Sequence, residues 1–383
     1  MPSQLEVRKI PDPGSRPHLP KCMASPTDTS IDNLTGDSPQ LAIPSGVRAA
    51  ANRAIDSGRA QHYTPRAGLD ALREAIVVHL ERQERGRVLA DDLVMVSGGQ
   101  TESLFLAIET LVSTGDEVVA IGEVPETTQP VVALAGGKLR HIPHYSSLER
   151  RGRGATGGAP EPRSVGLILI NNSGSAGQAW TGVALEHLAA IASDLDVPVL
   201  ALEDGIELTP SAVGHLSAAA CPGLRSRTLR VGGFLAWGLD SWRIGYITGP
   251  AAMVAPMTNL KQGLSICAPA LSQYAALAAI QDYSEWSTVA AEELAARRNL
   301  AWEILRGSRL SLKQVESGWT YVGRCDPPGE SPFLLGFLRS EARVIVSDAT
   351  RVAGSGAVQI TLCQPVPSLK ASLQRMKESL GRL

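Results

Sequence analysis

Apolar positions along this chain follow two patterns, which predict buried strands and helices with one buried face. Residues 165–170 and 197–202 are continuously apolar, as the strands of a buried parallel sheet are. Residues 69–82 and 102–112 instead repeat their apolar side chains at helical spacing. Residues 310–383 alternate short strands and helices, as a small domain would. By the same criteria, strands are expected near 93–97 and 138–143, and helices at 44–57, 183–193, 251–282 and 287–308.

The length of the chain sets the expected domain organisation. Its 383 residues can form a large and a small domain packed together. Residues 1–30 are polar and rich in proline, which predicts a disordered or loosely packed tail. A large domain with an N-terminal arm is expected at 31–285, and a small domain at 286–383. No signal peptide is visible, and no apolar run is long enough to span a bilayer.

Charge and cysteine content narrow the expected partners and compartment. A net charge of −2 gives no electrostatic reason to expect a nucleic acid or an anionic membrane as partner. The five cysteines are scattered and odd in number, which favours reduced, mostly buried thiols in a cytoplasmic protein. The seven histidines show no metal-ligand spacing, so no metal site is expected.

The stretch 229–246 carries the clearest motif. A short apolar strand runs into a glycine pair, a loop follows, and Arg243-Ile-Gly-Tyr opens another strand. The stretch resembles the class I/II aminotransferases, pyridoxal-phosphate (PLP) enzymes of fold type I. It is most similar to the 2-aminoadipate-aminotransferase/MocR-like subgroup. The resemblance implies an α/β fold, with a mostly parallel sheet sandwiched by helices and a smaller C-terminal α+β domain.

The resemblance also implies that the family's catalytic lysine is missing from this chain. Aligned without a gap, Phe234 and Arg243 match the subgroup's motif, and its Schiff-base lysine falls on Ala236. No lysine occurs between Lys138 and Lys261. The lysine of this family forms the internal aldimine and then carries the substrate's proton, and alanine can do neither. We therefore expect no covalently bound cofactor, although non-covalent pyridoxal phosphate stays open.

Two retained motifs point to an anion site and to a second subunit. Gly98, Gly99 and Gln100 follow a strand and open a helix, a position at which the family holds the cofactor phosphate together with Arg243. The glycines are also compatible with tight packing alone. Tyr63 matches a tyrosine that reaches the phosphate of the neighbouring subunit, which implies a homodimer. The alternative is a turn residue that packs on its own helix.

Other family positions have lost their chemistry. Thr127 replaces the tyrosine that stacks on the cofactor ring, Gly174 an asparagine, and Gly233 a serine that helps bind phosphate. Gln359 replaces the arginine that clamps the substrate carboxylate, which turns a charged fork into a neutral amide. These losses, with that of the lysine, favour a changed function over ordinary transamination.

Two acidic residues could supply the replacement chemistry. Asp204 matches the aspartate that pairs with the pyridinium nitrogen, although a shift of one residue would put Glu203 there. Glu207 replaces a tyrosine, and Asp204 and Glu207 could form a carboxylate pair that acts as acid and base. Alternatively, Asp204 caps a loop and Glu207 is solvated. Four tryptophans are expected near one face, where they line a pocket for an apolar or aromatic ligand or pack between the domains: Trp180, Trp237, Trp242 and Trp319.

Four functions are considered. The preferred one is a repurposed, PLP-independent enzyme of specialised metabolism that acts on a small amino-acid-derived substrate. In it Asp204 and Glu207 are catalytic, and Thr127, Gly174, Trp180, Ala236 and Gln359 line the substrate site. The second is an inactive subunit that pairs with an active homologue as a heterodimer. The third is an aminotransferase-like protein that holds PLP or its amine form without a covalent link. A ligand sensor ranks last, because the N-terminal tail is too short for a winged-helix domain.

Overall fold

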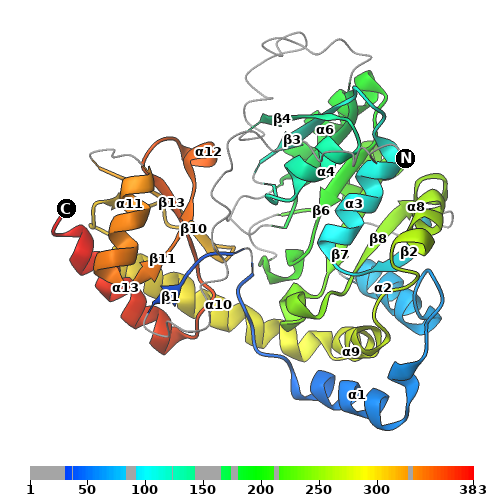
Figure 1. Cartoon of the computed structure of the whole chain (residues 1–383), viewed down its shortest axis with the longest axis horizontal. Coiled ribbons are helices and arrows are strands. Elements are labelled where there is room, and N and C mark those ends of the chain that lie inside the picture. The colour runs from blue at the N-terminus through cyan, green and yellow to red at the C-terminus, as the bar shows by residue number, and fades with distance from the viewer. Residues whose placement is uncertain are drawn as a thin grey trace, which may run out of the picture.

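The computed structural model describes residues 31–36, 38–82, 92–122, 124–142, 165–173, 180–210, 215–326 and 331–383. The described chain forms one large sheet on one side and a smaller C-terminal α+β part on the other (Figure 1). The long helix α10 (Tyr283–Leu305) connects them. Its residues Ala290 and Leu294 belong to the core under the large sheet, and Ala301 and Leu305 to the C-terminal core.

The large sheet has seven strands in the order β2-β8-β7-β6-β5-β3-β4. All neighbours are parallel except β8, which runs antiparallel to both β2 and β7. This confirms the expected mostly parallel sheet. The strands, in sheet order, are Asp92–Ser97, Gly245–Pro250, Thr228–Gly233, Val199–Leu202, Val165–Asn171, Glu117–Ile121 and Lys138–Ile142.

Helices bury both faces of this sheet, which explains why its central strands are apolar throughout. Along β3, Val118 and Ala120 join the core on one face, while Val119 and Ile121 join the core on the other. The first face packs against α3 (Gln100–Leu111), α4 (Thr128–Leu134) and α8 (Ala251–Leu264). The opposite face is covered by α2 (Asp70–Arg82), α6 (Gly182–Leu195), α7 (Pro222–Arg225) and α9 (Ala270–Gln281), and α1 (Ser45–Asp56) packs on α9.

Residues 251–282 were expected to be helical throughout, but they form two helices separated by a break. The prediction was wrong for the residues at this break. The chain leaves α8 after Leu264, adopts a positive φ of 63° at Ile266, and begins α9 after Pro269. A proline disfavours helical backbone at the residue before it, which explains the break. Among the described helices, none combines the length and the apolar character that a bilayer crossing needs.

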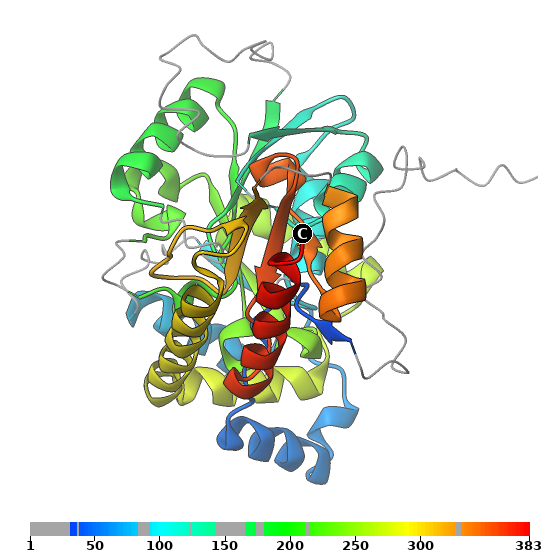
Figure 2. The ribbon, with the colours of Figure 1, turned by 90° about the vertical axis from the view of Figure 1, so that its left-hand side faces the viewer.

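The C-terminal part contains a four-stranded antiparallel sheet in the order β12-β13-β10-β9. Figure 2 shows α10 and α13 (Val366–Leu380) side by side, with α11 (Ser331–Phe337) and the π-helical turn Leu338–Ala342 nearby. The remaining elements are β9 (Leu310–Ser311), β10 (Thr320–Cys325), β12 (Ser347–Asp348), α12 (Thr350–Ala353) and β13 (Ala357–Thr361).

The N-terminal segment lies with the C-terminal part, not with the large sheet where the expected boundary put it. Strand β1 (Asp32–Asn33) pairs in parallel with β11 (Val344–Ile345). The Arg297 guanidinium donates to the carbonyl of Pro39 and to that of Leu362, which fixes the chain as it leaves this part. The segment then crosses to the large sheet, where the backbone of Leu41 lies directly against Gly238.

Candidate functional site

Four strand ends meet at one edge of the large sheet and position the candidate site. Ser97 ends β2 opposite Gly245 of β8, and Gly245 in turn faces Gly233 at the end of β7. The loop after Leu202 of β6 follows next to β7. Neighbouring strands lie about 4.8 Å apart, so roughly 10 Å separates the backbone at Ser97 from that at Gly233. A small molecule can span that distance.

A glycine turn and an arginine form the first end of this edge. Gly99 has a φ of 92° and precedes α3, whose first residue is Gln100. A Cβ atom on Gly245 would lie 3.0 Å from the Cα of Gly99, so the two backbones pass at close range. The exposed side chain of Arg243 lies over the turn, with its Nη1 3.5 Å from where a Cβ of Gly99 would be. Helix N-terminal amides with an adjacent guanidinium are suited to bind an anion.

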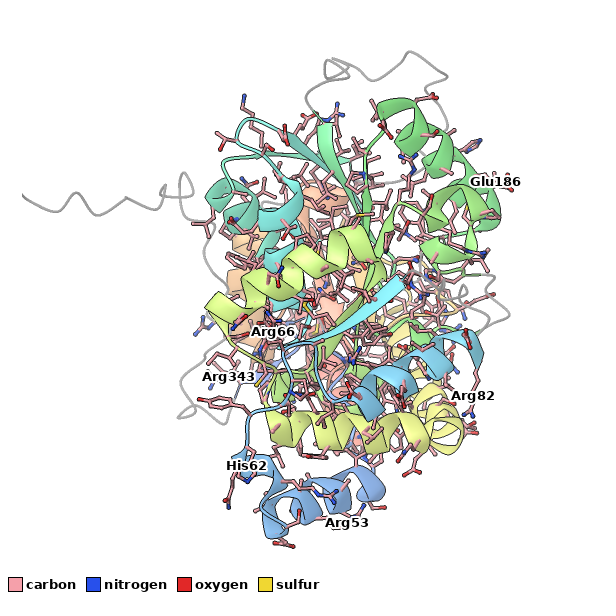
Figure 3. All side chains as sticks on the ribbon, turned by 90° about the vertical axis from the view of Figure 1, so that its right-hand side faces the viewer. Arg53, His62, Arg66, Arg82, Glu186 and Arg343 are labelled. Carbon is pink, nitrogen blue, oxygen red and sulfur yellow. The ribbon has the colours of Figure 1, made fainter. Side chains whose placement is uncertain are left out.

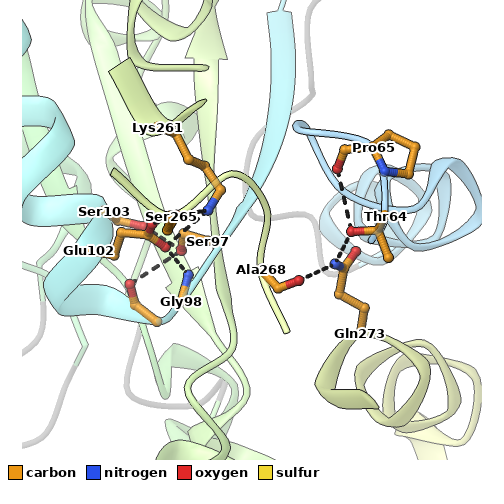
Figure 4. Close-up of polar contacts among 11 residues, drawn as sticks. Thr64, Pro65, Ser97, Gly98, Glu102, Ser103, Lys261, Ser265, Ala268 and Gln273 are labelled. Carbon is orange, nitrogen blue, oxygen red and sulfur yellow. Dashed lines mark hydrogen bonds and ion pairs between the residues drawn. The ribbon is translucent and has the colours of Figure 1, made fainter. Parts of the chain in front are cut away.

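A buried lysine supports this turn from behind (Figure 4). Lys261 of α8 is fully buried, and its Nζ lies 3.0 Å from Glu102 Oε1 and 2.8 Å from Ser265 Oγ. Glu102 also accepts the backbone N–H of Gly98, as a glutamate in the first turn of a helix commonly does. Burial opposes its ionisation, but the hydrogen bonds from Ser265 and Gly98 and the charge of Lys261 lower the pKa of Glu102 overall. Our sequence reasoning missed Lys261, since no local pattern joins it to Glu102.

Asp204 lies at the other end of this edge. Its Oδ1 accepts the backbone N–H of Leu235 at 3.2 Å, and its carboxylate packs on Gly233. Burial first, and then the negative charge of Glu207, raise the pKa of Asp204 to about 7; the Leu235 amide opposes this rise, and Asp240 adds a smaller one. Within the described chain, no cation is among the groups that set this pKa.

Glu203 points elsewhere, so Asp204 is the acidic residue at the 233–235 turn. The buried Glu203 carboxylate accepts hydrogen bonds from Asn172 Nδ2 at 2.9 Å and from Ser217 Oγ at 2.8 Å. The amide of Ala218 donates to it as well. These partners lie away from the glycine turn, and they occupy Glu203 fully.

Glu207 is buried, and the expectation of a solvated side chain was wrong. It lies in the 3₁₀ turn η2 (Ile206–Leu208), and its Oε1 is 3.4 Å from His79 Nε2 of α2. Both side chains are almost inaccessible, at 3% and 4% exposure. The ring of His79 packs on that of Trp237 with centroids 5.7 Å apart. His79 lies within the helix predicted at 69–82, and nothing in its spacing pointed to an acidic partner.

Comparison with known proteins identifies the family. The model of the aminotransferases of class I and II matches residues 28–200 and 235–368. The chain belongs to this family. The predicted resemblance to the class I/II aminotransferases is thereby confirmed at the level of the family; the subgroup and the loss of the lysine stay predictions. Residues 201–234, which carry Asp204 and Glu207, lie outside both matched segments.

Individual aminotransferases share the length and fold of the chain. The aromatic-amino-acid aminotransferase 2 of Thermococcus litoralis is 26% identical over 349 residues, covering 89% of this chain and 90% of that protein. The aspartate aminotransferase of Pyrococcus abyssi is 27% identical with the same coverage. The crystal structure of an aromatic aminotransferase from Pyrococcus horikoshii is 25% identical, covers 92% of this chain and 96% of that chain, and superposes with a TM-score of 0.82. The aminotransferase fold is therefore present over nearly the whole chain.

The tryptophans separate into two groups in this aminotransferase fold. Trp237 and Trp319 are buried in one apolar cluster, against which Trp242 packs. Trp319 comes from the C-terminal part, and its ring lies 2.6 Å from where a Cβ of Gly205 would be. Trp180 belongs to a different cluster, where its indole donates to the carbonyl of Asn171 at 2.8 Å. The expectation that Trp180 lies with the others was wrong.

The remaining predicted positions are spread over the fold. Ala236 is buried in η5 (Leu235–Trp237), and its carbonyl accepts the indole N–H of Trp286 at 2.7 Å. Thr127 is exposed just before α4, whereas Gln359 is buried in β13 of the C-terminal part. Gly174 lies outside the described residues. Over the described ranges, no three or more His, Cys, Asp or Glu side chains are grouped to hold a metal ion.

Proposed function

We propose that this member of the aminotransferase family is an enzyme that binds a small amino-acid-derived molecule without a covalent lysine link. Asp204 carries the proposal. Its carboxylate is desolvated, lies near two other carboxylates, and has no cation among the groups that set its pKa in the described chain. A ligand with a protonated nitrogen would supply the missing charge. The anion end of the same ligand would bind the Gly99 turn and Arg243.

The spacing of the two ends supports one ligand rather than two. The glycine turn follows β2 and Asp204 follows β6, with only the ends of β8 and β7 between them. Asp204 leans over Gly233 of β7, which brings its carboxylate closer to the turn by about one strand spacing of ~4.8 Å. The site therefore suits a molecule with a flat or extended body about 10 Å long, with an anionic group at one end and a basic nitrogen at the other.

Pyridoxal phosphate fits part of this site. Its phosphate would be held by Gly99, Gln100 and Arg243, and its ring nitrogen by Asp204. When bound, it supplies an electron sink for chemistry at the α-carbon of an amino acid. A covalent link to position 236 does not fit, because Ala236 has no amine. PLP or its amine form, held without a covalent link, is therefore an alternative within the proposal. Our preferred function is PLP-independent chemistry of specialised metabolism.

Asp204 is the residue that we propose moves a proton. A carboxyl whose pKa is about 7 is populated in both protonation states near neutral pH, so it can donate or accept a proton on a bound ligand. Arg243 and the amides of the glycine turn orient the ligand's anionic group. The packing of Trp319 on Gly205 keeps bulk water away from the back of the Asp204 loop.

The test is a visible absorption spectrum of the purified chain with added PLP, before and after gel filtration, with Asp204→Asn and Arg243→Gln as comparison variants. The non-covalent alternative is supported if a chromophore stays with the parent protein through gel filtration and is lost in both variants. Treatment with borohydride should then leave no adduct on the protein. The PLP-independent function is supported if no chromophore is retained and amino acids or 2-oxo acids raise the melting temperature of the parent. Asp204→Asn should abolish that increase. A borohydride-stable adduct on a lysine of the chain, or ligand effects unchanged in both variants, would overturn the proposal.

An inactive partner subunit is the second candidate, and the exposure of Tyr63 favours it. The Tyr63 side chain is 82% exposed, so it does not pack on its own helix. Next to it, Arg66 donates to Gln262 of α8 at 2.6 Å (Figure 3). Leu264 and Ile266 are half exposed at the end of that helix. An exposed aromatic and apolar patch of this kind suits a second aminotransferase-like subunit.

The mass of the protein in solution, measured together with its ligand binding and turnover, separates the enzyme from the inactive partner subunit. A homodimer that binds or turns over ligand by itself supports the enzyme. A chain that binds and turns over nothing alone, but restores or raises the activity of a co-purified aminotransferase, supports the partner role. In that case Tyr63→Ala should remove the effect on the partner and leave the fold of this chain intact.

A further inference from the structure

A buried histidine pairs with the carboxylate of Glu207, three residues after Asp204. His79 reaches Glu207 from α2, with its Nε2 3.4 Å from Glu207 Oε1. Gly205, which has a φ of 88°, and Ile206 separate Asp204 from Glu207 in the chain. The left-handed turn at Gly205 folds the loop back, so the two carboxyl groups act on each other electrostatically.

The two oxygens of Glu207 have different surroundings. Oε1 faces His79, whereas Oε2 is fully buried and accepts no hydrogen bond from any described residue. A buried carboxylate oxygen without a donor is costly, and the repulsion between the desolvated Asp204 and Glu207 carboxylates adds to that cost. One proton held between Asp204 and Glu207 removes much of that cost.

Several other ionisable groups of the described chain surround this pair. Asp240 adds a further negative charge near Asp204. The ring of Tyr246 lies over Gly232, and its pKa is raised, first by burial and then by Glu207. Arg230 acts on Glu203 and Tyr246. On α10, which also packs on η2, Arg297 is engaged by Glu293 and by two backbone carbonyls, and Arg298 donates to Gly318.

We propose that His79, by donating a hydrogen bond to Glu207, holds Glu207 as the carboxylate and leaves the shared proton on Asp204, where it faces the ligand. His79 is thus a positioning residue: it touches no ligand, and it decides which of the two carboxyls is the acid. The ligand-facing role rests on the proposed function. The location of the proton is a property of the ligand-free chain, and it can be measured there.

The inference predicts in which direction the proton affinity of Asp204 changes when the His79 donor is removed. With Glu207 held ionised, Asp204 keeps its proton to near neutral pH and donates one hydrogen bond toward the site. Without the His79 donor, Glu207 becomes the better proton acceptor, and Asp204 becomes an ordinary ionised carboxylate. Glutamine at position 79 can still donate a hydrogen bond to Glu207, whereas leucine fills a similar volume and cannot.

The experiment is a pH titration by carbon NMR of the full chain, labelled with 13C at the aspartate side-chain carboxyl. Asp204→Asn identifies the Asp204 signal, and the parent chain is compared with His79→Leu, His79→Gln and Glu207→Gln. We expect Asp204 to titrate near neutral pH in the parent and in His79→Gln. In His79→Leu and Glu207→Gln its midpoint should fall by at least about one pH unit, a tenfold change in proton affinity.

Several outcomes would overturn the inference. Leu and Gln variants at position 79 that titrate alike would remove the donor role, and an unchanged midpoint in Glu207→Gln would remove the shared proton. If His79→Leu does not fold, the other two variants still test the inference, because His79→Gln must keep the parent midpoint and Glu207→Gln must lower it. Pyridoxamine 5′-phosphate binding, followed by tryptophan fluorescence in the same samples, tests the proposed function separately. Failure of that probe to bind leaves the titration result standing.

Discussion

The carboxylate of Asp204 occupies the space into which any side chain at position 233 would project. A Cβ atom on Gly233 would overlap both carboxylate oxygens and the carbon that joins them. The serine that the family resemblance places at position 233 is thus incompatible with Asp204 in its present position. Glycine at 233 and the inward position of Asp204 depend on each other.

Gly233→Ser should therefore displace Asp204 from the 233–235 turn. We expect a loss of about 1–3 kcal/mol in the free energy of unfolding, because overpacking forces the carboxylate or the backbone to move. Chemical denaturation measures it. Gly263→Ala is the matched control, since a Cβ there meets open space, and helix propensity predicts unchanged or slightly higher stability. Equal stabilities for Gly233→Ser and the parent would contradict the overlap.

Asp204→Asn should change how stability depends on pH. Because the folded chain holds the Asp204 proton up to about pH 7, and the ordinary pKa is 3.8, the associated stabilisation is complete below about pH 4 and is lost as the pH rises through 7. The variant, which cannot ionise, should exceed the parent by on the order of 4 kcal/mol near pH 8 and show no such advantage near pH 4. Denaturation of both proteins at the two pH values measures this, and a difference that is the same at both would contradict it.

Lys261→Met should weaken both the fold and the anion end of the site. It leaves Glu102 as an uncompensated negative charge behind the glycine turn, so we expect a loss of about 3 kcal/mol in stability and weaker binding of pyridoxamine 5′-phosphate. The double variant Lys261→Met with Glu102→Gln removes both charges and should recover much of either loss. Denaturation and fluorescence titration provide the two measurements. A double variant as weak as Lys261→Met would show that charge is not the cause.

Ala236→Lys tests whether position 236 is the family's lysine position. If the alignment through Phe234 and Arg243 is correct, the new amine should form an aldimine with added PLP. The product would be a yellow, gel-filtration-stable protein with a borohydride-reducible link. Peptide mapping should place the adduct on position 236. Leu235→Lys, one residue away, is the control and should give no such adduct. An adduct of equal yield in both would contradict the register.

Local patterns predicted the elements well, because each pattern reports on backbone geometry and on one buried face. The strands β5 and β6, the helices α2 and α3, and the mostly parallel sheet follow from apolar runs and helical spacing. The expected single helix over 251–282 failed because Pro269 and the left-handed Ile266 interrupt it.

By itself the sequence determined the family, the glycine turn at the start of α3, and the identity of the residues at the altered positions. Only the tertiary structure decided which of these residues act together. His79 and Glu207 are 128 residues apart in the sequence, and Lys261 and Glu102 are 159 apart. The tertiary structure also turned Glu203 toward Asn172 and Asp204 toward Gly233. The physical reason is that charge pairing and desolvation depend on distances through space, which sequence spacing does not encode.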